Sequence, residues 1–163
     1  MQTQAVSTIH FLADAMLGRL ARWLRVLGWD TAYDPATRDP ALVDWARTED
    51  RILLTRDRPL LVELRPDRAL LIVAERPLDQ LRQVVTDVGL GSPVELFTRC
   101  LVCNAGLRPA TEAEWASLVP PEARALPGPV RRCPGCGRVY WSGSHARRMR
   151  AALGRAFPEW RLA

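Results

Sequence analysis

All cysteines of the chain occur in two Cys-x-x-Cys pairs, and this pattern restricts how the second half can fold. The pairs read RCLVCN and RCPGCG, and 29 residues separate them. Four thiolates in two close pairs are the ligands of a tetrahedral zinc site, which would hold two distant segments at one point. Because the usual spacing is about 15–20 residues, we expect the linker to contain structure of its own. The predicted zinc ligands are Cys100, Cys103, Cys133 and Cys136. Disulfides and a redox dithiol are the alternatives to a zinc site.

The N-terminal part of the chain alternates short apolar segments with amphipathic helical patterns. Such alternation is typical of βαβ units, and it predicts an α/β fold with a mostly parallel sheet flanked by helices. Near residue 98, prolines, turns and the cysteine pairs replace the pattern. We therefore predict an α/β domain at 7–97 and a small zinc-binding module at 98–163. Strands are predicted at 7–13, 31–33, 52–55 and 69–74, and helices at 15–27, 39–49, 77–88 and 146–156.

Three aspartates stand where a parallel sheet would bring them to one edge. Asp14 follows the first strand, Asp57 follows the third, and Asp39 opens the helix that leads into that third strand. Ligands of open parallel sheets bind beyond the carboxyl ends of the strands. Because uncompensated carboxylates repel one another, we expect the three to share a hard divalent ion, Mg²⁺ or Mn²⁺. The structural alternatives are helix N-caps at Asp14 and Asp39 and a turn residue at Asp57.

Several motifs in the chain are also those of a known family. The segment DPALVDWARTEDRILLTRD is similar to the later half of PIN-like nuclease domains, which end a helix–strand unit with Thr-x-Asp. The whole chain resembles the Mut-seven C-terminal RNase domain family, in which a zinc ribbon follows a PIN-like domain. The resemblance implies a PIN-like nuclease domain at 7–97, a zinc ribbon at 98–163 and metal-dependent ribonuclease activity. The matching motifs are FLADAMLGRLARWLR at 11–25, RILLTRD at 51–57, RCLVCN at 99–104 and CPGCGRVYWSGSH at 133–145.

On this hypothesis Asp14, Asp39 and Asp57 are the catalytic acids. They would hold one or two Mg²⁺ or Mn²⁺ ions against a scissile RNA phosphate. The chain departs from the family pattern at one point. Standard PIN nucleases have a further acid on an early helix, and this acid has no clear counterpart here.

The basic residues are all arginine, and they are concentrated at the C-terminal end. Residues 131–163 hold eight arginines and one glutamate, whereas the rest of the chain is close to neutral. Arginines beside aromatic rings suit unpaired nucleotides, which offer phosphates and stacking surfaces. A solvated helix face is the alternative for the arginines, including Arg19, Arg22 and Arg25 of the first helix; Trp141 could instead pack the ribbon and His145 could cap the last helix. The predicted RNA contacts are Arg56, Arg138, Trp141, His145, Arg147 and Arg148.

The sequence thus predicts a Mg²⁺- or Mn²⁺-dependent ribonuclease with a structural zinc ribbon that helps to bind single-stranded RNA. A non-catalytic RNA-binding or adaptor module with a degenerate acid site is the main alternative, and a toxin-type endonuclease is a third. No apolar run approaches the ~20 residues that cross a membrane. Unpaired thiols and the lack of a recognisable signal peptide predict a cytoplasmic location. No protein partner is predicted.

Overall fold

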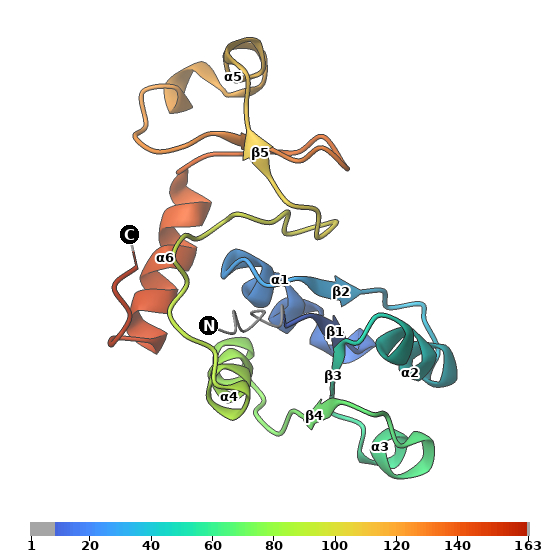
Figure 1. Ribbon diagram of the computed structural model, residues 1–163. Coiled ribbons are helices and arrows are strands. Elements are labelled where there is room, and N and C mark those ends of the chain that lie inside the picture. The colour runs from blue at the N-terminus through green and yellow to red at the C-terminus, as the bar shows by residue number, and fades with distance from the viewer. Residues whose placement is uncertain (1–8, 163) are drawn as a thin grey trace, which may run out of the picture.

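A parallel four-stranded sheet forms the centre of the protein (Figure 1), which we describe from a computed structural model over residues 9–162. The strand order is β2-β1-β3-β4, and every neighbouring pair is parallel. The strands are β1 (Phe11–Ala13), β2 (Thr31–Tyr33), β3 (Ile52–Thr55) and β4 (Ala69–Leu71), and the helices between and after them are the 3₁₀ helix η1 (Ala15–Leu17), α1 (Gly18–Val26), α2 (Asp39–Thr48), α3 (Arg58–Leu64) and α4 (Pro77–Val88).

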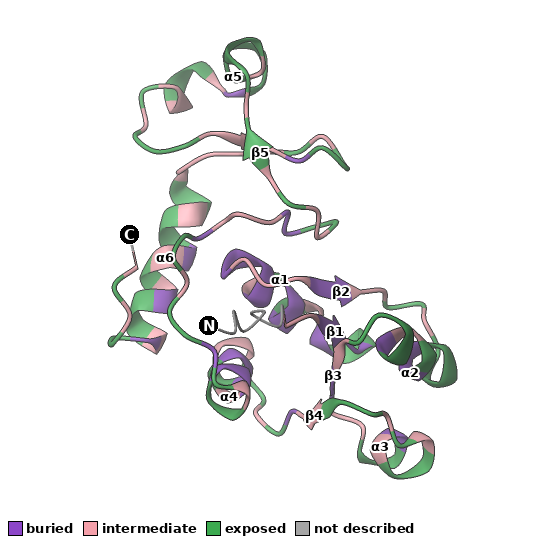
Figure 2. Cartoon of the chain, viewed as in Figure 1, coloured by how far each residue is buried: buried purple, intermediate pink, exposed green. Residues whose placement is uncertain are grey.

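Successive residues of the central strands point to opposite faces of the sheet and divide the core in two. In β1, Phe11 and Ala13 pack with α1 and α4, whereas Leu12 packs with α2 and α3. In β3, Leu54 joins the first cluster and Leu53 the second. All five side chains have an exposed fraction of 0%. The sheet is therefore buried on both faces, as parallel sheets require, and Figure 2 shows the buried residues on the strands and the inward helix faces.

Most elements of this part confirm the predictions from sequence. The helix at 77–88 and the strands at 31–33 and 52–55 have the predicted bounds. The fourth strand ends at Leu71 rather than at the predicted residue 74. The first strand begins at Phe11, within the predicted range 7–13. Residues 7 and 8 of that range lie outside the described residues. Helix α3 was not predicted. Asp57, before Arg58 and Pro59, was interpreted as a possible turn residue, although proline is well tolerated in the first turn of a helix.

The C-terminal part is a small antiparallel sheet with its own helices. The long linker between the cysteine pairs contains structure, as expected, including a helix that begins with a capping box between Thr111 and Glu114. The last helix begins at Ser144, two residues before the predicted start. The strand order of the small sheet is β5-β6-β7. The elements of the C-terminal part are β5 (Arg108–Pro109), α5 (Glu112–Leu118), the 3₁₀ helix η2 (Pro121–Ala123), β6 (Arg131–Arg132), β7 (Val139–Tyr140) and α6 (Ser144–Ala156).

Helix α6 returns from this module to the α/β body and packs against α4 (Figure 1). Its residues Met149 and Leu153, and Phe157 just after it, belong to the same hydrophobic cluster as Phe11 of β1. The two parts of the chain on either side of residue 98 thus share one core, and the domain division at that residue stays a prediction. None of the helices within residues 9–162 is both long enough and apolar enough to cross a membrane.

Candidate functional site

The four cysteine thiols converge at one point. Their Sγ atoms all lie within 4.8 Å of one another, with 3.6 Å between Cys100 and Cys136 and 3.3 Å between Cys103 and Cys133. Zn–S bonds of about 2.3 Å in a tetrahedron place sulfur atoms about 3.8 Å apart. None of the four cysteines is in a disulfide. The cluster therefore fits a single zinc ion with four thiolate ligands.

The two Cys-x-x-Cys turns have the same backbone structure. In each, the N–H of the second cysteine donates to the Sγ of the first at 3.4 Å. The N–H of the first cysteine also donates to the carbonyl two residues beyond the second, at 2.8 Å. The residue after the second cysteine is left-handed, with φ of 68° at Asn104 and 76° at Gly137, a conformation that these two residue types tolerate. N–H groups directed at sulfur stabilise thiolates, so the backbone is arranged for metal binding.

Hydrogen bonds also shift the acidity of the thiols. The backbone N–H of Arg138, followed by its side chain, lowers the pKa of Cys136 to about 6. Burial raises the pKa of Cys100, but N–H groups and the Tyr140 hydroxyl outweigh it and bring that pKa below its ordinary value. Loss of hydration, followed by hydrogen bonding among the thiols, raises the pKa of Cys103 to about 12. Zinc binding would thus displace a proton from Cys103, as metal binding to thiols commonly does.

Asn104 joins the first cysteine turn to the central sheet. Its side-chain oxygen accepts a hydrogen bond from the N–H of Thr31 at 3.0 Å, and its amide donates to Asp30 at 2.8 Å. Asp30 in turn forms ion pairs with Arg51 at 2.6 Å and with Arg99 at 3.7 Å. The zinc module is thus bound to the start of β2 by a polar network.

Arg25 makes a second connection between the two parts. Its side chain has an exposed fraction of only 5%. It donates to the carbonyl of Thr31 at 2.9 Å and to the carbonyls of Leu101 and Val102 at 3.0 Å each. Leu101 and Val102 are the two residues inside the first Cys-x-x-Cys pair. Arg25 therefore holds the cysteine turn against α1 and β2, and it does not belong to a solvated or RNA-facing row of arginines.

The strand-end aspartates Asp14 and Asp57 are connected through Thr55, the threonine of the Thr-x-Asp motif. The Thr55 hydroxyl donates to Asp14 Oδ2 at 2.7 Å and accepts from the N–H of Asp57 at 3.0 Å. Thr55 is fully buried and Asp14 is buried beside it. Asp14 also accepts from the N–H of Ala15, and Asp57 caps α3 by accepting from the N–H of Leu60 at 3.1 Å. Both carboxylates therefore have fixed positions at the carboxyl edge of the sheet.

The expected convergence of three aspartates is not what the structure shows. Among residues 9–162, only the cysteines form a group of three or more potential ligand residues with ligand atoms within 4.8 Å of one another. The N-cap interpretation of Asp39 is wrong, because Arg38 takes that position and Asp39 is the exposed first residue of α2. Helix α2 itself packs against β3 and α3.

A cleft of ≈ 560 Å³ opens over the sheet edge, and its lining includes Ala15, the residue after Asp14. Arg19 and Arg22 of α1 and Arg56 after β3 line it, and so does Glu75, which follows β4. Three arginines favour an anionic ligand beside the acids. Glu75 is a candidate acid that the sequence analysis missed. Its signal was its place directly after the strand predicted at 69–74, just as Asp14 directly follows the first predicted strand.

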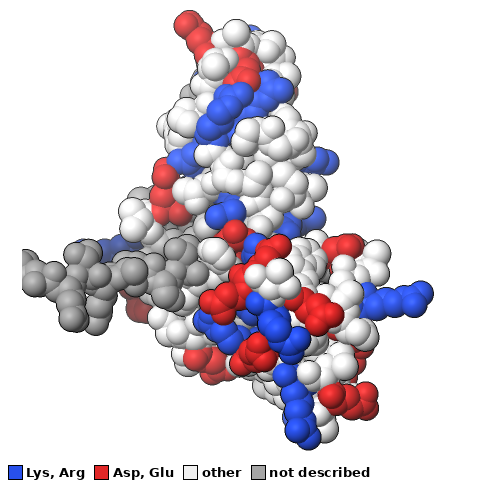
Figure 3. Space-filling view, turned by 45° about the vertical axis from the view of Figure 1, so that its right-hand side comes forward, with Lys and Arg blue, Asp and Glu red and all other residues white. Residues whose placement is uncertain are grey.

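The predicted RNA contacts divide between separate surfaces. Arg56 lines the cleft beside Asp14, whereas Trp141 and His145 line a groove at the base of the zinc module. Arg147 and Arg148 are exposed on α6, and the Arg138 side chain interacts with the Cys136 thiol. His145 is not the cap of α6, since Gly143 holds that position. On the face drawn in Figure 3, acidic and basic side chains alternate over the α/β body, in line with its nearly neutral charge.

Comparison of the sequence with known protein families identifies the family of the chain. The sequence matches the family model described as Mut7-C RNAse domain over residues 9–153. The matched range contains the sheet with its strand-end acids and all four cysteines. The chain belongs to the Mut7-C RNAse domain family. Membership confirms the resemblance seen in the sequence, indicates a nuclease or RNA-related role and implies an RNA substrate. No match was found among curated proteins or among solved structures.

Proposed function

We propose that the protein is a Mg²⁺- or Mn²⁺-dependent ribonuclease that cleaves RNA in the cleft beside Asp14 and Asp57. The observation that carries the proposal is the link that Thr55 makes between the Asp14 carboxylate and the backbone N–H of Asp57, next to an arginine-lined cleft whose walls include the neighbouring residues Ala15 and Arg56. Mg²⁺ is commonly bound by one or two carboxylates together with substrate phosphates, so the pair fits such an ion. When bound, the ion would polarise the scissile phosphate and activate water.

The protein residues of the cleft have separate tasks in this proposal. Asp14 and Asp57 supply fixed carboxylate oxygens, because Thr55 and the start of α3 restrict their rotation. Arg56, Arg19 and Arg22 bind phosphate oxygens, to which a guanidinium donates two parallel hydrogen bonds. Asp39 is proposed as an outer acid, since it is exposed at the start of α2, whereas Asp14 is buried.

The zinc site has a structural role in the proposal. Cys100, Cys103, Cys133 and Cys136 would fill the coordination shell of the ion and leave no open position for a substrate. The module would instead present Arg138, Trp141, His145, Arg147 and Arg148 to single-stranded RNA, with aromatic stacking and phosphate contacts.

The decisive test is an Mn²⁺ titration of cleavage of a labelled single-stranded RNA. We expect Asp57→Asn to lower the rate by about 100-fold or more, because one carboxylate charge at the ion is lost. Asparagine is also a good N-cap, so α3 should keep its start. Asp44→Asn, an exposed change on the outer side of α2, is the matched control and should cleave like the wild type. Undiminished cleavage by Asp57→Asn would contradict the proposal.

A non-catalytic RNA-binding module is the second candidate. It is favoured by the fact that the ligand atoms of Asp14, Asp39 and Asp57 do not all lie within 4.8 Å of one another, and by the hydrogen bonds that both oxygens of Asp14 already accept from the protein. In that case the wild type would bind RNA without cleaving it at any Mg²⁺ or Mn²⁺ concentration. Binding would still weaken in Arg56→Gln, whereas Asp57→Asn would leave it unchanged or strengthen it by removing a negative charge.

A further inference from the structure

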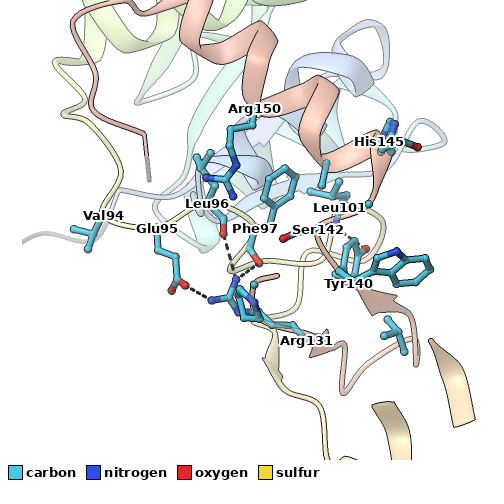
Figure 4. A pocket seen from close by; sticks show the side chains of 17 residues that line it. Val94, Glu95, Leu96, Phe97, Leu101, Arg131, Tyr140, Ser142, His145 and Arg150 are labelled. Carbon is cyan, nitrogen blue, oxygen red and sulfur yellow. Dashed lines mark hydrogen bonds and ion pairs between the residues drawn. The ribbon is translucent and has the colours of Figure 1, made fainter. Parts of the chain in front are cut away.

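A second cavity, of ≈ 590 Å³, lies where the zinc module meets the α/β body. Its walls come from three segments that are separate in sequence: the connection after α4, the segment that leads into β6, and the continuous stretch from β7 through the following turn into α6. Cavities of about 300–1,000 Å³ are typical of small-molecule sites. Figure 4 shows this groove, with Leu96, Phe97 and Leu101 among its apolar side chains and Tyr140 at one side.

The groove contains one arginine whose charge is balanced and one whose charge is not. Arg131 pairs with Glu95 and donates to the carbonyls of Leu96 and Phe97 at 3.3 and 3.1 Å (Figure 4). Arg150, by contrast, reaches from α6 over the ring of Phe97, with its guanidinium carbon 5.9 Å from the ring centroid. Its buried Nη1 has no hydrogen-bond partner among the described residues.

Arg150 lines the groove and forms no ion pair among the described residues, so its guanidinium charge favours an anionic ligand there. The start of α6 adds to the positive potential of the same groove. Gly143, Ser144 and His145 line it, and no side chain caps the helix there. The first N–H groups of a helix of this length are donors for an anion.

The aromatic wall of the groove is held in place by a glycine. A Cβ atom on Gly143 would lie 2.9 Å from Nε1 of Trp141, so the indole in its present position lies close against the glycine at the start of α6. Trp141 is half-buried and therefore keeps part of its ring accessible. A ring surface beside a cation and a helix N-terminus suits a flat aromatic group that carries a phosphate.

We propose that this groove binds one unpaired RNA nucleotide, with its base against Trp141 and the apolar wall and its phosphate at Arg150 and the start of α6. The inference rests on the proposed RNA-binding role of the zinc module, and it adds a defined nucleotide subsite separate from the cleavage cleft. Phosphate contacts and aromatic stacking together are the usual means of holding single-stranded RNA.

The test is binding of 5′-AMP to the full-length, zinc-loaded protein without Mg²⁺ or Mn²⁺. The readout is the indole N–H signal of Trp141 in ¹H–¹⁵N NMR spectra, assigned with Trp141→Phe. We expect 5′-AMP to shift this signal, and we expect Arg150→Met to weaken its binding by about tenfold. Arg155→Met is the matched control, because Arg155 is exposed on the same helix outside the groove. Adenosine should bind more weakly than 5′-AMP and equally to both variants.

Two results would overturn the inference. One is that millimolar 5′-AMP causes no shift of the Trp141 signal. The inference fails in this way also if a carboxylate-bearing peptide shifts the signal and 5′-AMP does not. The other is an equal effect of Arg150→Met and Arg155→Met. The cleavage proposal fails separately: Asp57→Asn should abolish cleavage and retain 5′-AMP binding, whereas Arg150→Met should raise KM for RNA without changing kcat.

Discussion

Thr55 shows how much a single hydroxyl decides in this protein. It is buried, it donates to one acid of the cleft, and it accepts the N–H of the other. We expect Thr55→Val, which keeps the shape, to leave a buried carboxylate oxygen without its donor and to lower the free energy of unfolding by about 1–3 kcal/mol. Cleavage should fall by at least about tenfold, because Asp14 loses its fixed orientation.

Urea unfolding and the RNA cleavage assay measure the two effects of this substitution. Thr55→Ser is the control, since it keeps the hydroxyl and should restore most of both properties. Wild-type cleavage by Thr55→Val would show that Thr55 does not position the carboxylates.

At the scale of elements, Asp30 connects the first cysteine turn to β2 and β3. Burial would raise the pKa of Asp30, but hydrogen bonds from Arg51 and Asn104 and the charges of Arg51 and Arg99 outweigh it, so that pKa lies below its ordinary value. A lowered folded-state pKa contributes stability above the unfolded value of about 4, and this contribution is lost as pH falls through the folded-state pKa. The network therefore stabilises the protein at neutral pH and weakens in acid.

We expect Asp30→Asn to lower the free energy of unfolding at pH 7 by about 1–3 kcal/mol, because two arginines lose their partner. The difference from the wild type should shrink below about pH 4, where the wild-type carboxylate becomes protonated. Urea unfolding at a series of pH values measures it. Asp44→Asn, at an exposed ion pair, should change stability by less than about 0.5 kcal/mol. A pH-independent difference for Asp30→Asn would rule out this charge mechanism.

At the scale of the whole molecule, the zinc cluster and the α/β body depend on one another. Arg25 and Asn104 connect the first cysteine turn to α1 and β2, and α6 carries the chain from the second turn back onto α4. Structural zinc contributes about 10–16 kcal/mol to the folding of small zinc peptides. Its removal should therefore affect more than the module that holds it.

We expect chelation of zinc to lower the Tm of the whole protein by at least about 10 °C, since about 1 kcal/mol corresponds to 2–4 °C in a chain of this size. Amide hydrogen exchange in α1 and β2 should accelerate as well, because their contacts to the cysteine turn are lost. Calorimetry and exchange measurements with and without a chelator test this. Unchanged exchange in the α/β body after chelation would show that the two parts are energetically independent.

Features that depend on residues close together in sequence could be predicted from the sequence, whereas features that depend on contacts between distant segments could not. Helix α4 was predicted with its bounds, since its pattern of Leu and Val and the glycine after it are local signals. The four cysteines were predicted as one cluster because their spacing and number leave few other arrangements. Asp14 and Asp57 were placed correctly at strand ends, because short apolar strands and the residues that follow them are visible as local patterns in the sequence.

The tertiary structure decided everything that depends on which segments meet. Arg19, Arg22 and Arg25 look equivalent in sequence, yet only Arg25 is buried, because the first cysteine turn packs onto its side of α1. Asp14, Asp39 and Asp57 were expected to share an ion, yet their ligand atoms do not all lie within 4.8 Å of one another. The sequence by itself thus determined the chemistry that the chain carries, from the zinc ligands to the acids. Long-range packing determined which of these groups lie together, since strand order and the contacts between distant segments leave no local pattern.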